Sequence, residues 1–342
     1  MLVQSESMKT SLNRKPTAND VARLAGVSQP AVSRAFTEGA SISPAMRERV
    51  MMAAKALGYR PNAIARSLTQ NRSNVVGLVL GHIDNPFFAL ALNKLAAALD
   101  DVGYQMLLFT AEANATVDKQ VEQMLSHQVS AVILLAVNLS SSLTDECKAA
   151  GIPVILFNRT IADDQATFAV TGDNVGGAAA IAEHFLDRGK SKIAFMAGYE
   201  DSSTSQSREA AFQAYLIQKG LPPARRVVGH YSRAGAAAAA RTLFSNAPDR
   251  PDALFCANDL MAITTIETLR EEFGLEPGRD YALAGFDDIP MASWPSFMLT
   301  TYSQPVDAMV SAAVACVRAL DDSVIPQRRI ILEGQLIIRK TT

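Results

Sequence analysis

Short apolar runs alternate with amphipathic stretches along most of the chain. The first runs are VVGLVL at residues 75–80, QMLLFT at 105–110 and AVILLA at 131–136, and apolar side chains at helical spacing follow them. Strands that are apolar throughout, with helices between them, are typical of parallel sheets covered on both faces. The alternation restarts after residues 168–170, so the sequence predicts two α/β layer sandwiches in succession.

The same pattern defines the individual elements of the two sandwiches. Strands are predicted at residues 75–80, 105–110, 131–136, 154–157, 168–170, 192–196, near Val227, and at 253–256, 281–285, 330–332 and 336–338. Helices are predicted at residues 87–102, 117–125, 143–150, 176–186, 204–219, 234–244, 259–273 and 306–319. The residues before this region follow helical periodicity only, which indicates a separate all-α part at the N-terminus.

Residues 17–57 carry the start and stop signals of three short helices. Thr17 is expected to cap a helix over residues 18–25, and Gly26 permits the left-handed turn that ends it. Ser28 is expected to cap a second helix, which tolerates Pro30 because first-turn amides lack helical partners. Ser43 begins a third helix in the same way. The predicted inward-facing residues of the first two helices are Val21, Leu24, Ala25, Ala31, Val32, Ala35 and Phe36.

Two short helices joined by a tight glycine turn form a helix-turn-helix unit. In GVSQPAVSRAF, residues 26–36, the second helix turns a polar face outward, which is the geometry that enters the major groove of DNA. Arg34 can pair with guanine and Gln29 with a base edge, each discriminating by about 1–3 kcal/mol. The predicted DNA contacts of this unit are Thr17 and Ser28 to phosphate, and Gln29, Pro30, Ser33 and Arg34 on the reading face. The alternative is a three-helix interaction domain with solvated arginines.

The charge distribution favours the DNA-binding interpretation. The net charge is only −2, yet residues 1–72 hold 11 Lys and Arg against 4 Asp and Glu, a net +7, and the remaining 270 residues carry −9. A basic head on an acidic body suits attachment to phosphate. Three scattered cysteines indicate a reducing compartment. No apolar run reaches the roughly 18 residues of a membrane span, so a cytoplasmic protein without a membrane partner is expected.

The segment that follows the third helix, together with the helix-turn-helix unit, resembles one particular family of proteins. DVARLAGVSQPAVSRAF at residues 20–36, the Ser-Pro start of the third helix, and LGYRPNAIARSL at 57–68 together resemble the DNA-binding head and hinge of the LacI/GalR family of transcription regulators. The resemblance implies that the hinge helices of a dimer order on the operator and wedge Leu68 into the central minor groove. It also implies hinge contacts to DNA at Asn62, Ala65 and Arg66.

The resemblance implies a domain organisation that spacing alone does not define. The predicted parts are a flexible tail at 1–15, a helix-turn-helix domain at 16–60, a hinge helix and linker at 61–73, and an effector-binding and dimerisation domain at 74–342. In this family the chain crosses between two subdomains three times. The N-subdomain is therefore expected at about 74–171 plus 304–325, and the C-subdomain at about 172–301 plus 326–342.

The loops that follow the strands are where a ligand is expected, since open parallel sheets bind ligands beyond the carboxyl ends of their strands. The predicted effector contacts, which match the periplasmic-sugar-binding-like domain of the family, are Phe87, Phe88, Asp173, Thr204, Arg208, Tyr231, Asn258 and Asp287. Such a set suits a polyhydroxylated ligand, because hydroxyls both donate and accept hydrogen bonds. For each residue alone, helix capping or core packing is the alternative. Ser202 stands where purine-responsive relatives of the family have an arginine, which disfavours a purine base. A saccharide, a sugar acid and a phosphorylated sugar remain as alternatives, and a sugar or sugar acid is expected.

Two other classes of protein compete with this interpretation. An enzyme is disfavoured because the chain lacks a phosphate loop, a dinucleotide GxGxxG, an HExxH zinc helix and a GxSxG elbow. A sugar-binding receptor without a DNA-binding role matches the body but not the head. We therefore predict a transcription regulator, most consistent with a repressor. As a homodimer it would bind a palindromic double-stranded DNA operator under the control of a small-molecule effector, with no cofactor and no metal.

Overall fold

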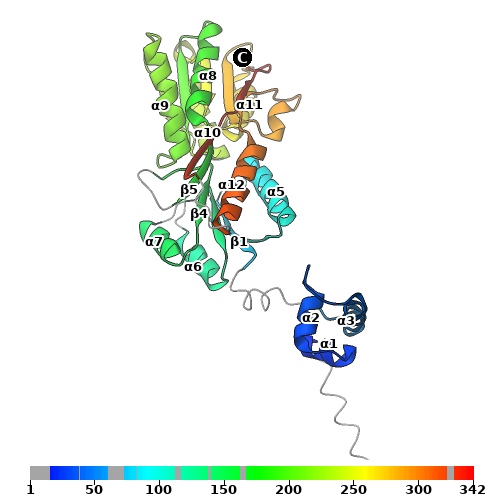
Figure 1. The fold of residues 1–342 in the computed structure, drawn as a ribbon. Helices are drawn as coiled ribbons and strands as arrows, with labels where there is room; N and C mark the ends of the chain where they lie inside the picture. The colour runs from blue at the N-terminus through cyan, green and yellow to red at the C-terminus, as the bar shows by residue number, and fades with distance from the viewer. Residues whose placement is uncertain are drawn as a thin grey trace, which may run out of the picture. The chain divides into compact units, whose positions relative to one another are not determined.

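The computed structural model of the chain describes residues 16–37, 39–60, 73–81, 83–111, 117–137, 140–161, 167–321 and 327–342. The chain divides into two compact units, Met1–Ser73 and Asn74–Thr342. Figure 1 shows the helices and strands of both units. The predicted tail at 1–15 and nearly all of the predicted hinge lie outside the described residues.

The first unit consists of three helices whose ends carry the expected capping signals. They are α1 (Ala18–Ala25), α2 (Gln29–Ala35) and α3 (Pro44–Leu57). The carboxylate of Asp20 accepts hydrogen bonds from the amide of Thr17 at 2.9 Å and from its hydroxyl at 2.7 Å, which fixes the start of α1. Gly26 ends that helix at φ 64°, a left-handed conformation in which a side chain is strained. The hydroxyl of Ser43 accepts from the amide of Met46 at 3.3 Å.

The core of this unit is built from small and β-branched side chains. Val21, Val32 and Val50, one from each helix, are all buried. The expectation that Leu24 is also in this core is wrong, since its side chain is 56% exposed. The buried stripe of α1 instead runs along Ala18, Val21, Ala22 and Ala25, and the three alanines let the helices approach closely. Leu24 lies well to one side of that stripe on the helix.

The first half of the second unit is a parallel sheet between two layers of helices. Its strands are β1 (Val75–Leu80), β2 (Gln105–Thr110), β3 (Ala131–Leu135), β4 (Val154–Phe157), β5 (Phe168–Gly172) and β11 (Arg329–Leu332), in the order β11-β5-β4-β3-β1-β2. Its helices are α5 (Pro86–Asp101), α6 (Asp118–Ser126), α7 (Ser141–Ala149) and α12 (Val306–Asp321). Strands β3 and β4 are buried along their whole length, as expected for a sheet covered on both faces.

The second half repeats this arrangement with one departure from the predicted parallel sheet. Its strands are β6 (Ile193–Ala197), β7 (Arg225–Val228), β8 (Ala253–Cys256), β9 (Ala282–Asp287), β10 (Thr300–Ser303) and β12 (Gln335–Ile337), in the order β12-β10-β9-β8-β6-β7. Its helices are α8 (Asn174–Asp187), α9 (Ser203–Gln218), α10 (Arg233–Phe244) and α11 (Asp259–Phe273), with short 3-10 turns at Ala247–Asp249 and Pro290–Ser293. The edge strand β12 is antiparallel to β10.

The chain passes between the two sheets three times: after β5, after β10, and between β11 and β12. The predicted start of the last C-subdomain segment at residue 326 is wrong, because Arg329–Leu332 pairs with β5 of the first sheet. At the crossings the amide of Asp173 donates to the carbonyl of Leu332 at 2.9 Å, and the amide of Gly334 donates to the hydroxyl of Tyr302 at 3.0 Å. The three crossing segments are therefore tied to one another.

Among the described residues, no helix combines the length and the apolar character needed to cross a bilayer.

Candidate functional site

The first candidate site is the outer face of α2 in the three-helix unit. Ala31, Val32 and Ala35 of this helix are buried. The exposed residues at and after its start are Ser28, Gln29, Pro30, Ser33 and Arg34, which are the residues predicted to face DNA. Helix α2 thus turns its polar side to solvent and its apolar side to the core.

The flanking residues of this face differ from their predicted roles in detail. Ser28 occupies the N-cap position of α2, but its hydroxyl makes no capping hydrogen bond, contrary to the prediction. Thr17 is half-buried and its hydroxyl proton is engaged by Asp20. The predicted hinge contacts Asn62, Ala65, Arg66 and Leu68 lie outside the described residues.

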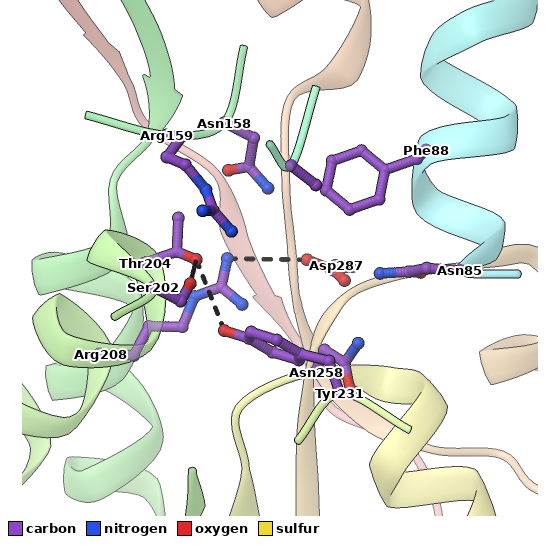
Figure 2. A pocket seen from close by; sticks show the side chains of 11 residues that line it. Asn85, Phe88, Asn158, Arg159, Ser202, Thr204, Arg208, Tyr231, Asn258 and Asp287 are labelled. Atoms are coloured by element: carbon purple, nitrogen blue, oxygen red, sulfur yellow. Dashed lines mark hydrogen bonds and ion pairs between the residues drawn. The ribbon is translucent and has the colours of Figure 1, made fainter. Parts of the chain in front are cut away.

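The second candidate site is a pocket in the two-sheet unit, with about 380 Å³ of space including its open mouth. Figure 2 shows its lining side chains converging from both halves of the unit. The lining residues are Asn85, Phe88, Ala136, Asn158, Arg159, Ser202, Thr204, Arg208, Tyr231, Asn258 and Asp287. The first five come from loops and helix starts that follow β1, β3 and β4, and the rest follow or end β6, β7, β8 and β9. The pocket lies where ligands bind in open α/β sheets.

Six of the eight residues predicted for an effector line this pocket, and two do not. The six are Phe88, Thr204, Arg208, Tyr231, Asn258 and Asp287. Phe87 is 1% exposed and packs edge-on against Phe88, with ring centroids 5.2 Å apart. Successive residues of a helix point about 100° apart, so the two rings cannot share one direction. Asp173 accepts a hydrogen bond from the amide of Gly176 at 2.8 Å, so its carboxylate caps α8.

Five lining residues were not among the predicted effector contacts. They are Asn85, Ala136, Asn158, Arg159 and Ser202. Asn158 and Arg159 directly follow β4, so the rule applied to the other strands would have found them. Ser202 and Asn85 cap α9 and α5, with their side-chain oxygens facing the helix amides. For Ala136 the sequence holds no signal, because its methyl group is indistinguishable from those of the core.

Arg208 is the central cation of the pocket and is 1% exposed. Its Nε donates to Oδ1 of Asn174 at 2.8 Å, Nη1 donates to the carbonyl of Ala257, and the guanidinium lies 3.6 Å from the centroid of the Phe286 ring. Its Nη2 lies 3.7 Å from Oδ1 of Asp287, an ion-pair distance without a hydrogen bond. The side chain is thus held on three sides, and the Nη2 group, which carries two N–H donors, has no hydrogen-bond partner among the described residues.

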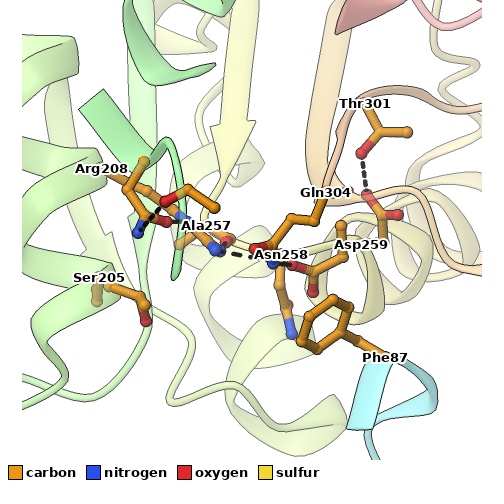
Figure 3. A network of polar contacts seen from close by, with 12 residues as sticks. Phe87, Ser205, Arg208, Ala257, Asn258, Asp259, Thr301 and Gln304 are labelled. Atoms are coloured by element: carbon orange, nitrogen blue, oxygen red, sulfur yellow. Dashed lines mark hydrogen bonds and ion pairs between the residues drawn. The ribbon is translucent and has the colours of Figure 1, made fainter. Parts of the chain in front are cut away.

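Asp287 is the buried carboxylate that faces this cation. Burial raises its pKa to about 6, although the charge of Arg208 and a hydrogen bond from Gln304 at 2.6 Å both favour the ionised form. Behind it lies Asp259, whose pKa burial and the charge of Asp287 raise well above the usual range. Asp259 accepts from the hydroxyl of Thr301 at 2.6 Å (Figure 3). The carboxylates therefore differ in role, since Asp259 joins strands and Asp287 faces the pocket.

Three buried polar atoms of the lining have no hydrogen-bond partner within the described part of the chain. They are Nη2 of Arg208, Nδ2 of Asn258 and Oδ1 of Asn158. Oδ1 of Asn258 accepts a hydrogen bond from the backbone amide of Met261 at 3.0 Å, which turns the Nδ2 group away from the helix. Two donors and one acceptor, each costly to bury alone, are what a ligand with several hydroxyl groups would satisfy.

A row of hydroxyl groups forms one wall of the pocket. Oγ of Ser202 lies 3.0 Å from Oγ1 of Thr204, which lies 3.4 Å from the hydroxyl of Tyr231. The Tyr231 ring covers Gly198 so closely that a Cβ there would lie 2.1 Å from the ring. Glycine at this position is therefore required to seat the ring.

The two units combine an exposed helix-turn-helix face with a polar pocket between two α/β halves, which defines a DNA-binding protein with a ligand-binding core. Residues 17–62 match the family described as bacterial regulatory proteins of the lacI family, and residues 182–342 match the periplasmic binding protein-like domain. The chain is 30% identical over 339 residues to the HTH-type transcriptional regulator CelR of Thermobifida fusca, which covers 96% of this chain and 98% of that protein. The chain belongs to the LacI family and is a DNA-binding transcription regulator.

Other relatives agree with this assignment and with the predicted fold. The ribose operon repressor of Escherichia coli K12 is 28% identical, covering 94% of this chain and 98% of that protein. A lac repressor dimer bound to operator and the anti-inducer ONPF has a TM-score of 0.85 at 25% identity, over 96% and 99% of the two chains. A CelR–cellobiose complex has a TM-score of 0.71 at 28% identity, over 96% and 100%. The relatives named here are regulators rather than enzymes, and the predicted fold and family are confirmed.

Proposed function

We propose that this protein is a repressor that binds a palindromic operator as a homodimer, under the control of a small sugar or sugar acid. The observation that carries the proposal is the pocket: buried, unpartnered polar atoms from both halves of the core face one cavity on a chain that also has a DNA-reading helix. The names of the relatives support the same direction, since they include an operon repressor and a regulator bound to cellobiose.

The head supplies the DNA-binding part of the proposal. Arg34 and Gln29 stand exposed on α2 above a buried apolar face, so they can reach base edges without disturbing the fold. The net charge of +7 over residues 1–72 supplies phosphate contacts, which are independent of sequence. Two heads related by a twofold axis match two half-sites of an inverted repeat.

The core supplies the control. A ligand in the pocket touches Phe88 and Arg159 from one half and Asn258 and Asp287 from the other, so it favours one angle between the halves. Within the described part of the chain, the two halves are connected by the three crossing segments, which would bend as that angle changes. Moving a two-state switch from 1:99 to 99:1 requires about 5.5 kcal/mol of differential affinity, which two bound ligands per dimer can share.

Operator selection tests this proposal. Full-length protein is incubated with a random duplex library, the bound sequences are enriched, and affinity is then measured with and without sugars and sugar acids. We expect an inverted repeat, much weaker binding to a single half-site, and a change in operator affinity with at least one ligand. Arg208→Ala is expected to lose the response to that ligand. A protein that binds a sugar but shows no preference for any inverted repeat would instead be a sugar-binding receptor.

A further inference from the structure

The turn at the end of β9 has a strained backbone where it reaches the pocket. Asp287 and Asp288 are consecutive residues with φ of 118° and 55°. Aspartate tolerates a φ near 55°, whereas 118° is disfavoured for any residue that carries a side chain. Such a conformation persists only where neighbouring groups hold it in place. The contacts around this turn therefore decide whether Asp287 keeps its position.

The charge of Asp287 adds a second reason for this residue to move. Its carboxylate is buried and lies 3.7 Å from Nη2 of Arg208 (Figure 2). Burial raises the pKa of Asp287 to about 6, so at neutral pH the ionised group would gain solvation by turning to water. The side chain of Gln304 donates to the carboxylate at 2.6 Å, but its backbone amide lies 3.5 Å from the carbonyl of Asp287. The backbone of Asp287 is therefore held weakly by its direct neighbours.

Two contacts hold the residues that follow Asp287. The carboxylate of Asp259 accepts a hydrogen bond from the amide of Ile289 at 2.9 Å. Nη2 of Arg339 donates to the carboxylate of Asp288 at 2.7 Å. The side chains of Arg339 and Asp288 are only 13% and 24% exposed, so water screens this ion pair little. Each of the two residues after Asp287 is thus restrained by a charged partner from another part of the chain.

Arg339 is itself fixed to the second sheet. Its Nη1 donates to the carbonyl of Leu299 at 2.8 Å, and its backbone amide donates to the hydroxyl of Thr300 at 2.9 Å. Two residues further on, the hydroxyl of Thr341 accepts from the amide of Thr300 at 2.8 Å and donates to the carbonyl of Leu283 at 2.7 Å. The C-terminal segment is therefore bound to both β9 and β10, and the guanidinium of Arg339 has a fixed place beside the turn.

We propose that Arg339 is a positioning residue of the effector pocket. Its ion pair with Asp288 holds the strained turn in which the carboxylate of Asp287 faces the ligand. Arg339 is not among the residues that line the pocket, so it acts through the turn and not by contact with the ligand. This inference rests on the proposed function, because it takes the pocket as the effector site.

Titration calorimetry on the full-length protein tests the inference, with ribose, glucose, glucuronate and cellobiose as probes. Arg339→Met removes the charge and keeps a long side chain, and we expect about tenfold weaker binding of each probe that the parent binds. The matched control is Arg270→Met. Arg270 also forms an ion pair, with Glu276 at 2.8 Å, and contacts the carbonyl of Ser296 in the loop after β9. The control should keep the affinity of the parent. Unchanged affinity in Arg339→Met, or an equal loss in both variants, would overturn the inference.

A second measurement needs no ligand. In the parent, Asp287→Asn is expected to raise the urea midpoint at about pH 7 and not at about pH 4, because it removes a buried charge. If the turn relaxes in Arg339→Met, Asp287 reaches water, and the gain from Asp287→Asn should fall to less than half in that background. Arg208 and Asp259, which face Asp287 from α9 and α11, are the same in all these proteins. A gain that stays intact contradicts the inference, even where no probe binds.

Asp288→Gly decides the same question if Arg339→Met does not fold. Glycine adopts a φ of 55° without strain, so this variant removes the ion pair and leaves the backbone conformation available. We expect it to weaken binding of the same probes and to reduce the gain from Asp287→Asn. Where both variants fold, combining them should weaken binding no further than Arg339→Met alone, since both remove one interaction. Losses that multiply would show that Arg339 acts elsewhere.

Operator affinity is measured on the same samples, so that the two proposals can fail separately. A parent that prefers no inverted repeat refutes the proposed function, and the pH comparison then still decides whether Arg339 holds Asp287. A parent that binds both operator and probe, with Arg339→Met equal to it in calorimetry and in the pH comparison, refutes only the role of Arg339.

Discussion

Replacing Asp287 by asparagine is expected to stabilise the ligand-free protein at neutral pH and to change little in acid. Asn has nearly the same shape and keeps an oxygen to accept the hydrogen bond from Gln304. What it removes is the negative charge that burial disfavours. Asp287 has a pKa of about 6 in the folded protein, against an ordinary value of 3.8. The folded state therefore binds the proton more tightly than the unfolded state does.

The sign and the size of the effect follow from this difference. The contribution of Asp287 to stability is fully present below about pH 4 and is lost as the pH rises through about 6. A shift of about two pKa units at ~1.4 kcal/mol each gives a loss of roughly 3 kcal/mol at pH 7. Asn does not titrate, so the variant escapes this loss. Asp259 is present in both proteins, so the part of its pH dependence that burial causes cancels in the difference, whereas the part caused by the charge of Asp287 does not.

The assay is urea unfolding of the ligand-free protein at a series of pH values, followed by tryptophan fluorescence. Trp294 is the single tryptophan and belongs to the two-sheet unit, so the signal reports that unit rather than the head. The free energy of unfolding of Asp287→Asn minus that of the parent should rise from near zero at about pH 4 to roughly 3 kcal/mol at about pH 7. A difference that does not change with pH, or a variant less stable at pH 7, would refute the argument from burial.

Three further substitutions have expected outcomes. Arg34→Ala should reduce the discrimination between bases at one base pair of each half-site by about 1–3 kcal/mol, measured as affinities for operators with single-base changes. If the variant instead loses the same binding free energy on every sequence, Arg34 contacts phosphate. Gly198→Ala should push the Tyr231 ring into the pocket and weaken effector binding about tenfold by calorimetry, and unchanged affinity would show that the ring can move aside. Gly26→Ala places a side chain at φ 64° and should lower the free energy of unfolding of the three-helix unit by about 1–2 kcal/mol. Hydrogen exchange of the amides of this unit measures the loss, and protection equal to that of the parent would contradict the prediction.

The sequence predicted the ends of the helices well because capping residues and glycine stops act on neighbouring residues of the chain. Gly26 and Ser43 act on their own neighbours, so the helix ends they define are found in the structure. Leu24 shows the limit of such reasoning, because its spacing from Val21 fits a helix stripe, yet the choice of stripe depends on where α3 lies. The assignment of Arg329–Leu332 failed for the same reason, since strand pairing over more than 150 residues leaves no mark in a short run of sequence.

Most of the predicted pocket residues follow from one rule, that ligands bind beyond the carboxyl ends of the strands in an open parallel sheet. Residues such as Asn258 and Asp287 follow or end apolar strands and were predicted from that position together with the family resemblance. Asp173 satisfies the same rule, but its carboxylate binds the nearby amide of Gly176, a local competition that sequence position cannot resolve. Arg159 satisfies the rule too and was overlooked, although it is buried and lines the pocket.

The hydrogen bond between Gln304 and Asp287 joins the pocket to the second crossing segment, and Oε1 of Gln304 would lie 2.6 Å from a Cβ at position 172 on the first crossing. Under the proposed function, a substitution at Asp287 would therefore disturb both the binding of the effector and the crossing segments that respond to it. Arg159 and Thr204 instead sit on the loop after β4 and at the start of α9, away from those segments. If relatives of this protein evolve to respond to a different ligand, we expect substitutions first at Arg159 and Thr204. The carboxylate of Asp287, beside the crossing segments, is expected to stay the same.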